Sequence, residues 1–358
     1  MLLSLTLTIV FSKNIPTKGF QFEVQRYTFF TIYARKKWFI SLFLRSNGFS
    51  EAFLLLFSLI ITTFAEKFDC SMILYPNAKI NLGLAVMRKR ADGYHDLETI
   101  FLPVTELHDE LEVLPLPAAS EQPYTFVQEG LAVDCSPEDN LIIRAYLAMR
   151  DRYPQVGPVA IRFRKRIPFG AGLGGGSADA AYMVKAVNTL FSLGLTDEEM
   201  ETIVSPLGAD CAFFIQNRPR FAEGIGNIFS EVPEAVLEQI RGKWIVLVKP
   251  SCAVSTAQAY RGIQRREEQG EMGIRDVHEL SQLTNDFERT VFPLFPEIAA
   301  VKQQLEQLGA CYAAMSGSGA TVFGLFSSQA SLTEALDRTG AQSLESLFPN
   351  CFIHQQQL

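Results

Sequence analysis

Residues 168–181 read Pro168-Phe169-Gly170-Ala171-Gly172-Leu173-Gly174-Gly175-Gly176-Ser177-Ala178-Asp179-Ala180-Ala181, a glycine-rich run that passes into an alanine-rich one. From Val159, apolar residues alternate with Arg and Lys, which is typical of a half-buried strand, and residues 178–191 read as a helix. A strand, a glycine loop and a helix start direct several backbone N–H groups and the helix dipole at one point. Glycine lets the backbone approach an anion closely. The run therefore predicts a cradle for nucleotide phosphates rather than a simple corner.

Two common phosphate loops do not fit this run. A Walker A loop closes on Gly-Lys-Ser/Thr, whereas Ser177 follows Gly176 directly. The dinucleotide pattern GxGxxG matches formally, but it requires a second strand with an acidic residue roughly 20 positions on. Thr196 and Glu199 instead read as the capping box of a second helix. We therefore treat the formal match as a coincidence.

The run resembles the second motif of the GHMP kinase superfamily, which includes galactokinase, homoserine kinase, mevalonate kinase and phosphomevalonate kinase. Residues 76–84 (PNAKINLGL) and 314–323 (AMSGSGATVF) resemble its other two motifs, in the same order. Within the superfamily, residues 91–95 (ADGYH), followed by LET, and 207–210 (LGAD) resemble the 4-diphosphocytidyl-2-C-methyl-D-erythritol kinases of the non-mevalonate isoprenoid pathway. The resemblance runs from about Met72 to near the C-terminus.

This resemblance implies a two-domain α+β fold with the active site between the domains. It places an N-terminal ATP-binding domain at residues 72–222 and a C-terminal, substrate-side domain at residues 223–350. The implied reaction is ATP-dependent phosphorylation of the 2-hydroxyl of 4-diphosphocytidyl-2-C-methyl-D-erythritol. Three alternatives stay open: a homoserine- or mevalonate-type kinase, a non-catalytic nucleotide-binding protein on the same fold, and a membrane-tethered protein.

The composition agrees with a small-molecule enzyme. Hydrophobic residues make up 48% of the chain and charged residues 20%, which suits a sizeable core. A net charge of −7 argues against a nucleic-acid-binding surface. The six cysteines are scattered, without CxxC pairs or zinc spacing, as is typical of a cytoplasmic protein. We expect no stable membrane association, and the oligomeric state stays open.

Residues 1–71 lie outside the resemblance. They hold 12 of the 28 phenylalanines, and their longest apolar run, residues 52–65, is shorter than the roughly 20 residues that span a bilayer. We expect that translation starts at Met72 and that residues 1–71 are not part of the fold. The alternative is a membrane-tethering segment, and a native peptide from within residues 13–67 would contradict the expectation.

Lys79 is the candidate cation for phosphoryl transfer, which needs stabilisation of developing charge. In the strand pattern that follows it, apolar residues 80, 82, 84 and 86 share one face, and Lys79, Asn81 and Gly83 share the other. A surface lysine on a half-exposed strand is the alternative. The resemblance implies that Lys79 is catalytic.

Asp210 is the candidate acid. Residues 206–210 read as a turn into an apolar helical stretch, residues 211–215, so Asp210 is also a candidate N-cap. Both roles are compatible, because an ionised acid at a helix start can accept a hydroxyl proton. In the resembling enzymes, the positions of Lys79 and Asp210 form the catalytic pair. Whether the acid is a full base or only orients the hydroxyl stays open.

ATP and Mg²⁺ are the implied cofactors. Backbone N–H groups around Gly172–Gly176 are expected to hold the β- and γ-phosphates, with Ser177 near Mg²⁺. Asn140 resembles an adenine-pocket residue and otherwise reads as the N-cap of a helix from Leu141. The nucleotide-binding set is Pro168, Gly170, Gly172, Leu173, Gly174, Gly175, Gly176, Ser177, Ala178 and Asn140.

The cytidine end of the acceptor is expected to lie against Tyr94, whose ring can stack on a base, and His95, which can hydrogen-bond the base edge. Asp92-Gly93 is also a plain turn signal, so an ordinary hairpin loop is the alternative. By the resemblance, Tyr260 covers the second face of the base. Together with the other two motifs, a second glycine turn between a helix at 298–308 and a strand at 321–326 is expected to close over the reacting groups. The acceptor-binding set is Asn81, Tyr94, His95, Tyr260, Gly317, Ser318 and Gly319.

Overall fold

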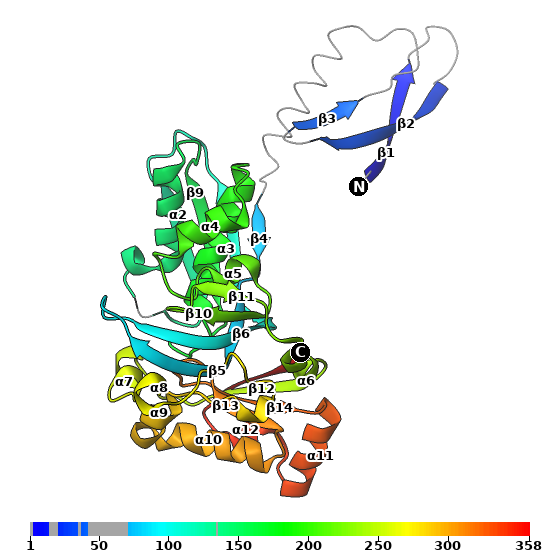
Figure 1. Cartoon of the computed structure of the whole chain (residues 1–358). Helices are drawn as coiled ribbons and strands as arrows, with labels where there is room; N and C mark the ends of the chain where they lie inside the picture. Colours follow the sequence, from blue (N-terminus) through cyan, green and yellow to red (C-terminus); the bar gives the residue numbers. More distant parts are fainter. Residues whose placement is uncertain (1–2, 14–20, 35–36, 42–70, 134) are drawn as a thin grey trace. The chain divides into compact units, whose positions relative to one another are not determined.

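The computed structural model describes residues 3–13, 21–34, 37–41, 71–133 and 135–358, and the chain divides into two units between Asp69 and Cys70 (Figure 1). The N-terminal unit contains an antiparallel sheet of β1 (Leu3–Lys13), β2 (Gln21–Ala34) and β3 (Lys37–Ser41), in that order. The apolar run at 52–65 lies outside the described residues. Among the residues that the structure describes, no helix is long and apolar enough to cross a membrane.

The second unit begins with a four-stranded sheet that carries the glycine loop. Its order is β4 (Met72–Leu74), β7 (Glu110–Pro115), β9 (Val159–Lys165) and β8 (Tyr124–Gly130). The alternation from Val159 therefore predicted β9 correctly. Residues of one face of this sheet pack with α2 (Leu141–Arg152) and α3 (Gly175–Leu190) in one core cluster.

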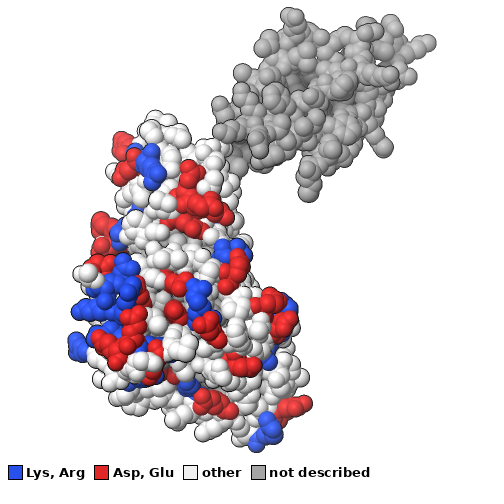
Figure 2. Space-filling view, in the orientation of Figure 1, with Lys and Arg blue, Asp and Glu red and all other residues white. Residues whose placement is uncertain are grey.

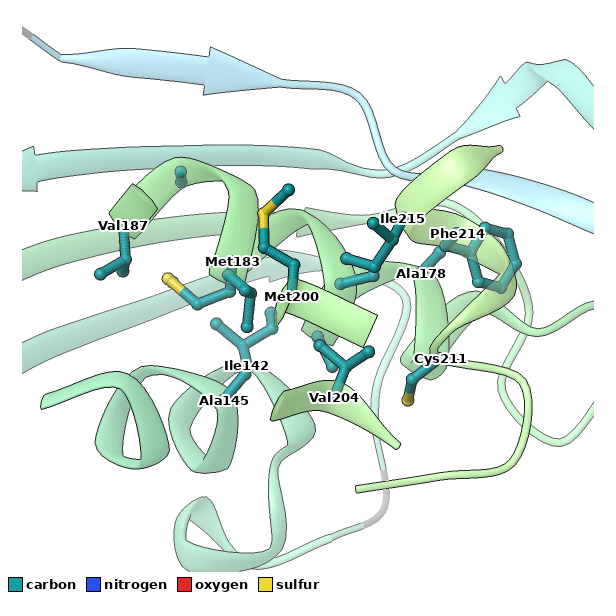
Figure 3. Close-up of a cluster of buried hydrophobic side chains, with 14 of the residues drawn as sticks. Ile142, Ala145, Ala178, Met183, Val187, Met200, Val204, Cys211, Phe214 and Ile215 are labelled. Atoms are coloured by element: carbon teal, nitrogen blue, oxygen red, sulfur yellow. The ribbon is translucent and has the colours of Figure 1, made fainter. Parts of the chain in front are cut away.

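Side chains from several helices meet in this core. Figure 3 shows Ile142 of α2, Met183 of α3 and Val204 of α4 (Asp197–Val204) directed at one another. Helix α3 begins at Gly175, three residues earlier than expected, and α4 has the predicted capping box of Thr196 and Glu199. This packing fixes the helix whose N-terminus follows the glycine loop.

Two further sheets complete the unit. One has the order β11 (Ile228–Ser230), β10 (Arg220–Glu223), β6 (His95–His108) and β5 (Asn77–Lys89). The other has the order β13 (Tyr312–Met315), β14 (Val322–Phe326), β12 (Trp244–Lys249) and β15 (Phe352–Gln357). Figure 1 shows β5 and β6, in cyan, between the green helices and the orange C-terminal elements.

The remaining helices lie mostly in the C-terminal half. The predicted helix at 298–308 is α10 (Pro296–Gln307), and the predicted strand at 321–326 is β14. The others are η1 (Pro137–Asp139), α5 (Phe213–Gln216), α6 (Glu234–Ile240), α7 (Thr256–Tyr260), α8 (Arg266–Gln269), η2 (Leu280–Gln282), α9 (Glu288–Leu294), α11 (Gln329–Thr339) and α12 (Leu344–Leu347).

Strand β5 departs from the predicted alternation. Leu82 is opposite Ile100 and Leu84 is opposite Thr99, which leaves Gly83 as an extra residue in a β-bulge with φ +70°. A bulge shifts the side-chain phase by one residue. Leu82 therefore packs in one core cluster, whereas Leu84 packs in another and lines the cavity with Lys79. The expectation that residues 80, 82, 84 and 86 share one face was wrong beyond Gly83.

The proposed domain boundary needs adjustment. A division between residues 222 and 223 cuts through β10, which pairs with β6 and β11. An end at residue 350 also leaves out β15, which pairs with β12. We therefore propose that the first domain runs through Ser230 and that the second includes β15.

Candidate active site

A cavity of about 660 Å³ brings together the three glycine-containing motifs. It is lined by residues of β5 and β6, the glycine loop, the turn at Asp210, helix α7 and the second glycine turn. The predicted residues that line it are Lys79, Asn81, Tyr94, His95, Gly170, Gly172, Gly174, Ser177, Asp210, Tyr260, Gly317, Ser318 and Gly319.

The glycine loop has the backbone conformation that its composition predicts. Gly170, Gly172 and Gly174 have φ of +61°, +74° and +70°. A Cβ on Gly172 would lie 2.1 Å from the carbonyl oxygen of Ser316, so no side chain fits there. Gly174 is the N-cap of α3 and supplies no capping side chain. The first N–H groups of a helix lack intrahelical partners, so those of α3 suit a phosphate.

Lys79 and Asp210 form an ion pair. The Nζ atom of Lys79 lies 3.1 Å from Oδ2 of Asp210 and donates a 2.5 Å hydrogen bond to Oδ1 of Asn81. The lysine side chain is 4% exposed and the aspartate side chain 30%. The lysine thus lies in the buried part of β5, residues 77–86, and is not the surface residue of the alternative interpretation. Its Nζ also lies 5.0 Å from the ring centroid of Phe101.

Asp210 is not a helix N-cap. Helix α5 begins at Phe213, and its N-cap is Ala212. Residues 209–212 form turns, and this leaves the Asp210 carboxylate to pair with Lys79. The next residue, Cys211, is buried beside Ser177, and burial raises the pKa of its thiol to about 12. Its neutral thiol adds no charge beside the ion pair.

One end of the cavity is aromatic. The rings of His95 and Tyr260 stack with centroids 4.7 Å apart and an interplanar angle of 24°, and Phe287 packs edge-on against Tyr260 at 4.7 Å. Tyr94 is 62% exposed, at the hairpin of β5 and β6, where Gly93 has φ +89°. Burial, with smaller effects of Arg265 and Lys89, lowers the pKa of His95, so its ring is neutral at pH 7. Burial also raises the pKa of Tyr260 to about 12.

Several predicted nucleotide-binding residues do not line the cavity. Asn140 is the N-cap of α2, where its Oδ1 accepts a 2.9 Å hydrogen bond from the N–H of Ile142. The capping alternative is therefore correct, and an adenine contact of this residue stays a prediction. The others not on the cavity wall are Pro168, Leu173, Gly175, Gly176 and Ala178.

Sequence reasoning missed the segment that holds the second glycine turn. The side-chain amide of Asn285, which is 2% exposed, donates to the carbonyl oxygens of Met315 at 2.7 Å and Gly317 at 2.8 Å. The carboxylate of Glu288 accepts a 2.8 Å hydrogen bond from the N–H of Met315. Ser316 links this turn to the glycine loop by donating to the carbonyl oxygen of Gly172 at 2.9 Å. Neither Asn285 nor Glu288 lies in a local pattern that distinguishes it.

The donor set at the cavity suits a nucleotide-bound Mg²⁺ rather than a protein-held metal. Among the residues that the structure describes, no three His, Cys, Asp or Glu side chains group as metal ligands. The Ser177 hydroxyl and the Asp210 carboxylate both line the cavity. Mg²⁺ in kinases is typically held by one or two side chains together with substrate phosphates. These two oxygen donors fit that pattern.

Charges of both signs are interleaved on the surface. Figure 2 shows Lys and Arg beside Asp and Glu over the visible face. Several of these groups form exposed ion pairs, such as Arg88 with Asp96 and Arg164 with Glu129. Exposed pairs of this kind contribute little to stability.

Comparisons with known proteins identify the superfamily. Residues 140–218 match the GHMP kinases N terminal domain, and residues 268–342 match the GHMP kinases C terminal domain. A 4-diphosphocytidyl-2-C-methyl-D-erythritol kinase of Bacteroides fragilis (strain YCH46) is 50% identical over 267 residues, which cover 74% of this chain and 95% of the relative.

Solved structures agree. A crystal structure of 4-(cytidine 5'-diphospho)-2C-methyl-D-erythritol kinase matches with a TM-score of 0.60 and 28% identity, covering 79% of this chain and 98% of that chain. A homoserine kinase from Cytophaga hutchinsonii has a similar TM-score of 0.59 at only 16% identity, covering 81% and 95% of the two chains, so that likeness shows the fold alone. The chain belongs to the GHMP kinase superfamily and, within it, to the 4-diphosphocytidyl-2-C-methyl-D-erythritol kinase family.

Proposed function

We propose that the cavity transfers the γ-phosphoryl group of ATP to the 2-hydroxyl of 4-diphosphocytidyl-2-C-methyl-D-erythritol, giving the 2-phosphate and ADP. The ion pair of Lys79 and Asp210 is the observation that carries this proposal, because it lies in one cavity with the glycine loop and the aromatic rings. The reaction is a step in the formation of isoprenoid precursors by the non-mevalonate pathway. The family relationship supports this choice of acceptor.

The roles of the pair follow from its position. In phosphoryl transfer the protein mainly positions groups and stabilises charge. The Lys79 ammonium would stabilise charge on the transferring group, while the Asp210 carboxylate orients the acceptor hydroxyl and accepts its proton. With a 30% exposed side chain, Asp210 can pass the proton to solvent.

The nucleotide would bind along the glycine loop and the start of α3. Uncapped N–H groups at Gly175, Gly176 and Ser177 would hold its phosphates, helped by the helix dipole. We propose that the Ser177 hydroxyl and the Asp210 carboxylate lie nearest to Mg²⁺. When bound with ATP, Mg²⁺ neutralises charge that develops on the phosphate oxygens.

The aromatic end would bind the cytosine base. The Tyr94 ring is available to stack on one face of the base, and Tyr260 on the other. A neutral His95 can accept or donate one hydrogen bond at the base edge. The His95 ring stacks on Tyr260, so the two side chains lie together at this end of the cavity.

A panel of acceptors tests this function. The full chain, given Mg-ATP, should release ADP with 4-diphosphocytidyl-methylerythritol and not with homoserine or mevalonate. Turnover with homoserine or mevalonate instead would assign the chain to another branch of the superfamily. Nucleotide binding without turnover of any acceptor would indicate a non-catalytic protein. The acceptor panel does not test three expectations of the sequence analysis, which stay proposals: a start at Met72, a cytoplasmic location and the lack of a nucleic-acid partner.

A further inference from the structure

We propose that Thr99 is a positioning residue for phosphoryl transfer, acting through Asn81 on the ammonium of Lys79; this inference rests on the proposed function. Thr99 belongs to β6, is 1% exposed and lines the cavity. Its hydroxyl donates a 2.6 Å hydrogen bond to the carbonyl oxygen of Gly83 and accepts one of 3.0 Å from Nδ2 of Asn81. The opposite end of the same amide, Oδ1, accepts from Lys79.

The chemistry of these groups fixes the direction of each hydrogen bond. A carbonyl oxygen only accepts, so the single hydroxyl proton of Thr99 points at Gly83. The hydroxyl lone pairs therefore face Asn81, and only its NH₂ group can donate to them. This places Oδ1 toward Lys79, whose ammonium has three donors and no acceptor. The Thr99 hydroxyl thus sets which end of the Asn81 amide faces the lysine.

The bulge in β5 supplies the carbonyl oxygen that accepts the hydrogen bond of the Thr99 hydroxyl. Gly83 has no partner in the register of β5 and β6, because Leu82 is opposite Ile100 and Leu84 is opposite Thr99. Its carbonyl is consequently available to the Thr99 hydroxyl instead of a neighbouring strand. The bulge and the threonine act together, and both lie in the segments that bring Lys79 to the cavity.

Lys79 is held between two oxygen acceptors, Asn81 and Asp210. The Nζ atom donates a hydrogen bond to Asn81 and lies 3.1 Å from Asp210, and the ammonium has a further N–H group that can donate to a phosphate oxygen. Without the Thr99 hydroxyl, nothing on β6 prevents the Asn81 amide from turning its NH₂ group toward the ammonium. The lysine would then lose an acceptor and its fixed position. Small displacements of a positioned catalytic group have large effects on rate.

Thr99→Val, which keeps the shape and removes the hydroxyl, tests this inference against Thr99→Ser, which keeps the hydroxyl. In the full chain with Mg-ATP and 4-diphosphocytidyl-methylerythritol, we expect Thr99→Val to lower kcat about tenfold to a hundredfold. The KM for ATP should not change, and Thr99→Ser should restore kcat. An unchanged kcat in Thr99→Val, or an equal loss in Thr99→Ser, would overturn the inference.

Coupling to Asn81 separates positioning from a general structural role. If Thr99 acts only through Asn81, Thr99→Val should lower kcat no further in the Asn81→Ala background, because residues acting as a unit are not additive. An equal loss of kcat in both backgrounds would overturn the inference. Thr99→Cys has nearly the same volume and a weaker donor. Should Thr99→Val not fold, Thr99→Cys must have a kcat below that of Thr99→Ser, and an equal kcat would overturn the inference.

Ser230→Ala is the control. The Oγ of Ser230 is also buried and has no hydrogen-bond partner among the described residues, and Ser230 does not line the cavity, so the loss of this hydroxyl should leave kcat unchanged. A wild-type chain without turnover of this acceptor would contradict the proposed function. An active wild type with a fully active Thr99→Val would contradict only the role of Thr99.

Discussion

The hydroxyl of Ser316 donates a 2.9 Å hydrogen bond to the carbonyl oxygen of Gly172 and thereby joins the two glycine-rich turns of the cavity. The same hydroxyl accepts a 3.2 Å hydrogen bond from the N–H of Asn81 on β5. The fully buried side chain of Ser316 thus connects the three motifs at residues 76–84, 168–181 and 314–323. The close approach that makes this possible depends on the lack of a Cβ at Gly172.

Gly172→Ala should abolish ATP binding, because the added Cβ would lie 2.1 Å from the carbonyl oxygen of Ser316. Gly194→Ala is the matched control: Gly194 has a similar φ of +71°, but a Cβ there would meet nothing within 4 Å. The control should lose only about 1 to 2 kcal/mol of unfolding free energy from its left-handed backbone. Calorimetric titration measures the ATP affinity of each variant, and thermal melts measure its stability. Equal ATP affinity in the two variants would contradict the close approach.

Tyr260→Ala should raise the KM for the acceptor and leave the KM for ATP unchanged. Stacking of a base on an aromatic ring contributes about 1 to 3 kcal/mol, which corresponds to roughly a 5- to 150-fold change in KM. Tyr260→Phe keeps the ring and should behave like the wild type. Steady-state kinetics with each substrate varied in turn distinguish these outcomes. A rise in the KM for ATP would place the ring at the other end of the cavity.

The kcat/KM for the acceptor should fall as the pH is lowered, and this fall should occur below pH 6.5, which is the ordinary pKa of histidine. Burial lowers the pKa of His95, so the neutral ring is the binding form and protonation at lower pH disrupts it. The same shift makes a neutral His95 stabilise the fold above pH 6.5, an effect lost as the pH falls through its lowered pKa. His95→Gln should lose this pH dependence. A profile that is identical in His95→Gln would exclude the ring as its source.

Asn285→Asp should destabilise the protein and impair acceptor binding. The substitution replaces the NH₂ group that donates to Met315 and Gly317 by an oxygen that repels both carbonyls. The unpaired buried groups cost about 1 to 3 kcal/mol of unfolding free energy, or more if the carboxylate stays charged. Asn350→Asp, at an exposed position, is the control and should melt like the wild type. Equal melting temperatures would show that the amide does not hold the turn.

The parts of the fold that depend on local sequence were predictable. The alternation before the glycine loop predicted β9, and the Thr196 capping box and the Asn140 N-cap are both present. Each of these signals involves residues within a few positions of one another. Their hydrogen bonds and periodicity can therefore be read without knowledge of the rest of the chain.

The parts that depend on distant partners were not predictable. The bulge at Gly83 follows from the pairing of β5 with β6, and it reverses the side-chain phase that simple alternation predicts. The local pattern of Asp210 reads as a helix N-cap, and only the family resemblance paired this residue with Lys79, which lies on β5. Asn285 and Thr99 are ordinary polar residues in the sequence. Their roles appear only when the fold brings Gly317 and Asn81 to them.

The central claim is that Asp210 and Lys79 act as the catalytic pair. ADP release by the full chain with Mg-ATP and 4-diphosphocytidyl-methylerythritol, compared between wild type and Asp210→Asn, tests it most directly. The variant keeps the shape of the side chain and loses its charge, so kcat should fall by about a hundredfold to ten-thousandfold, while ATP still binds. A kcat near that of the wild type would contradict the assignment of Asp210 and, with it, the mechanism.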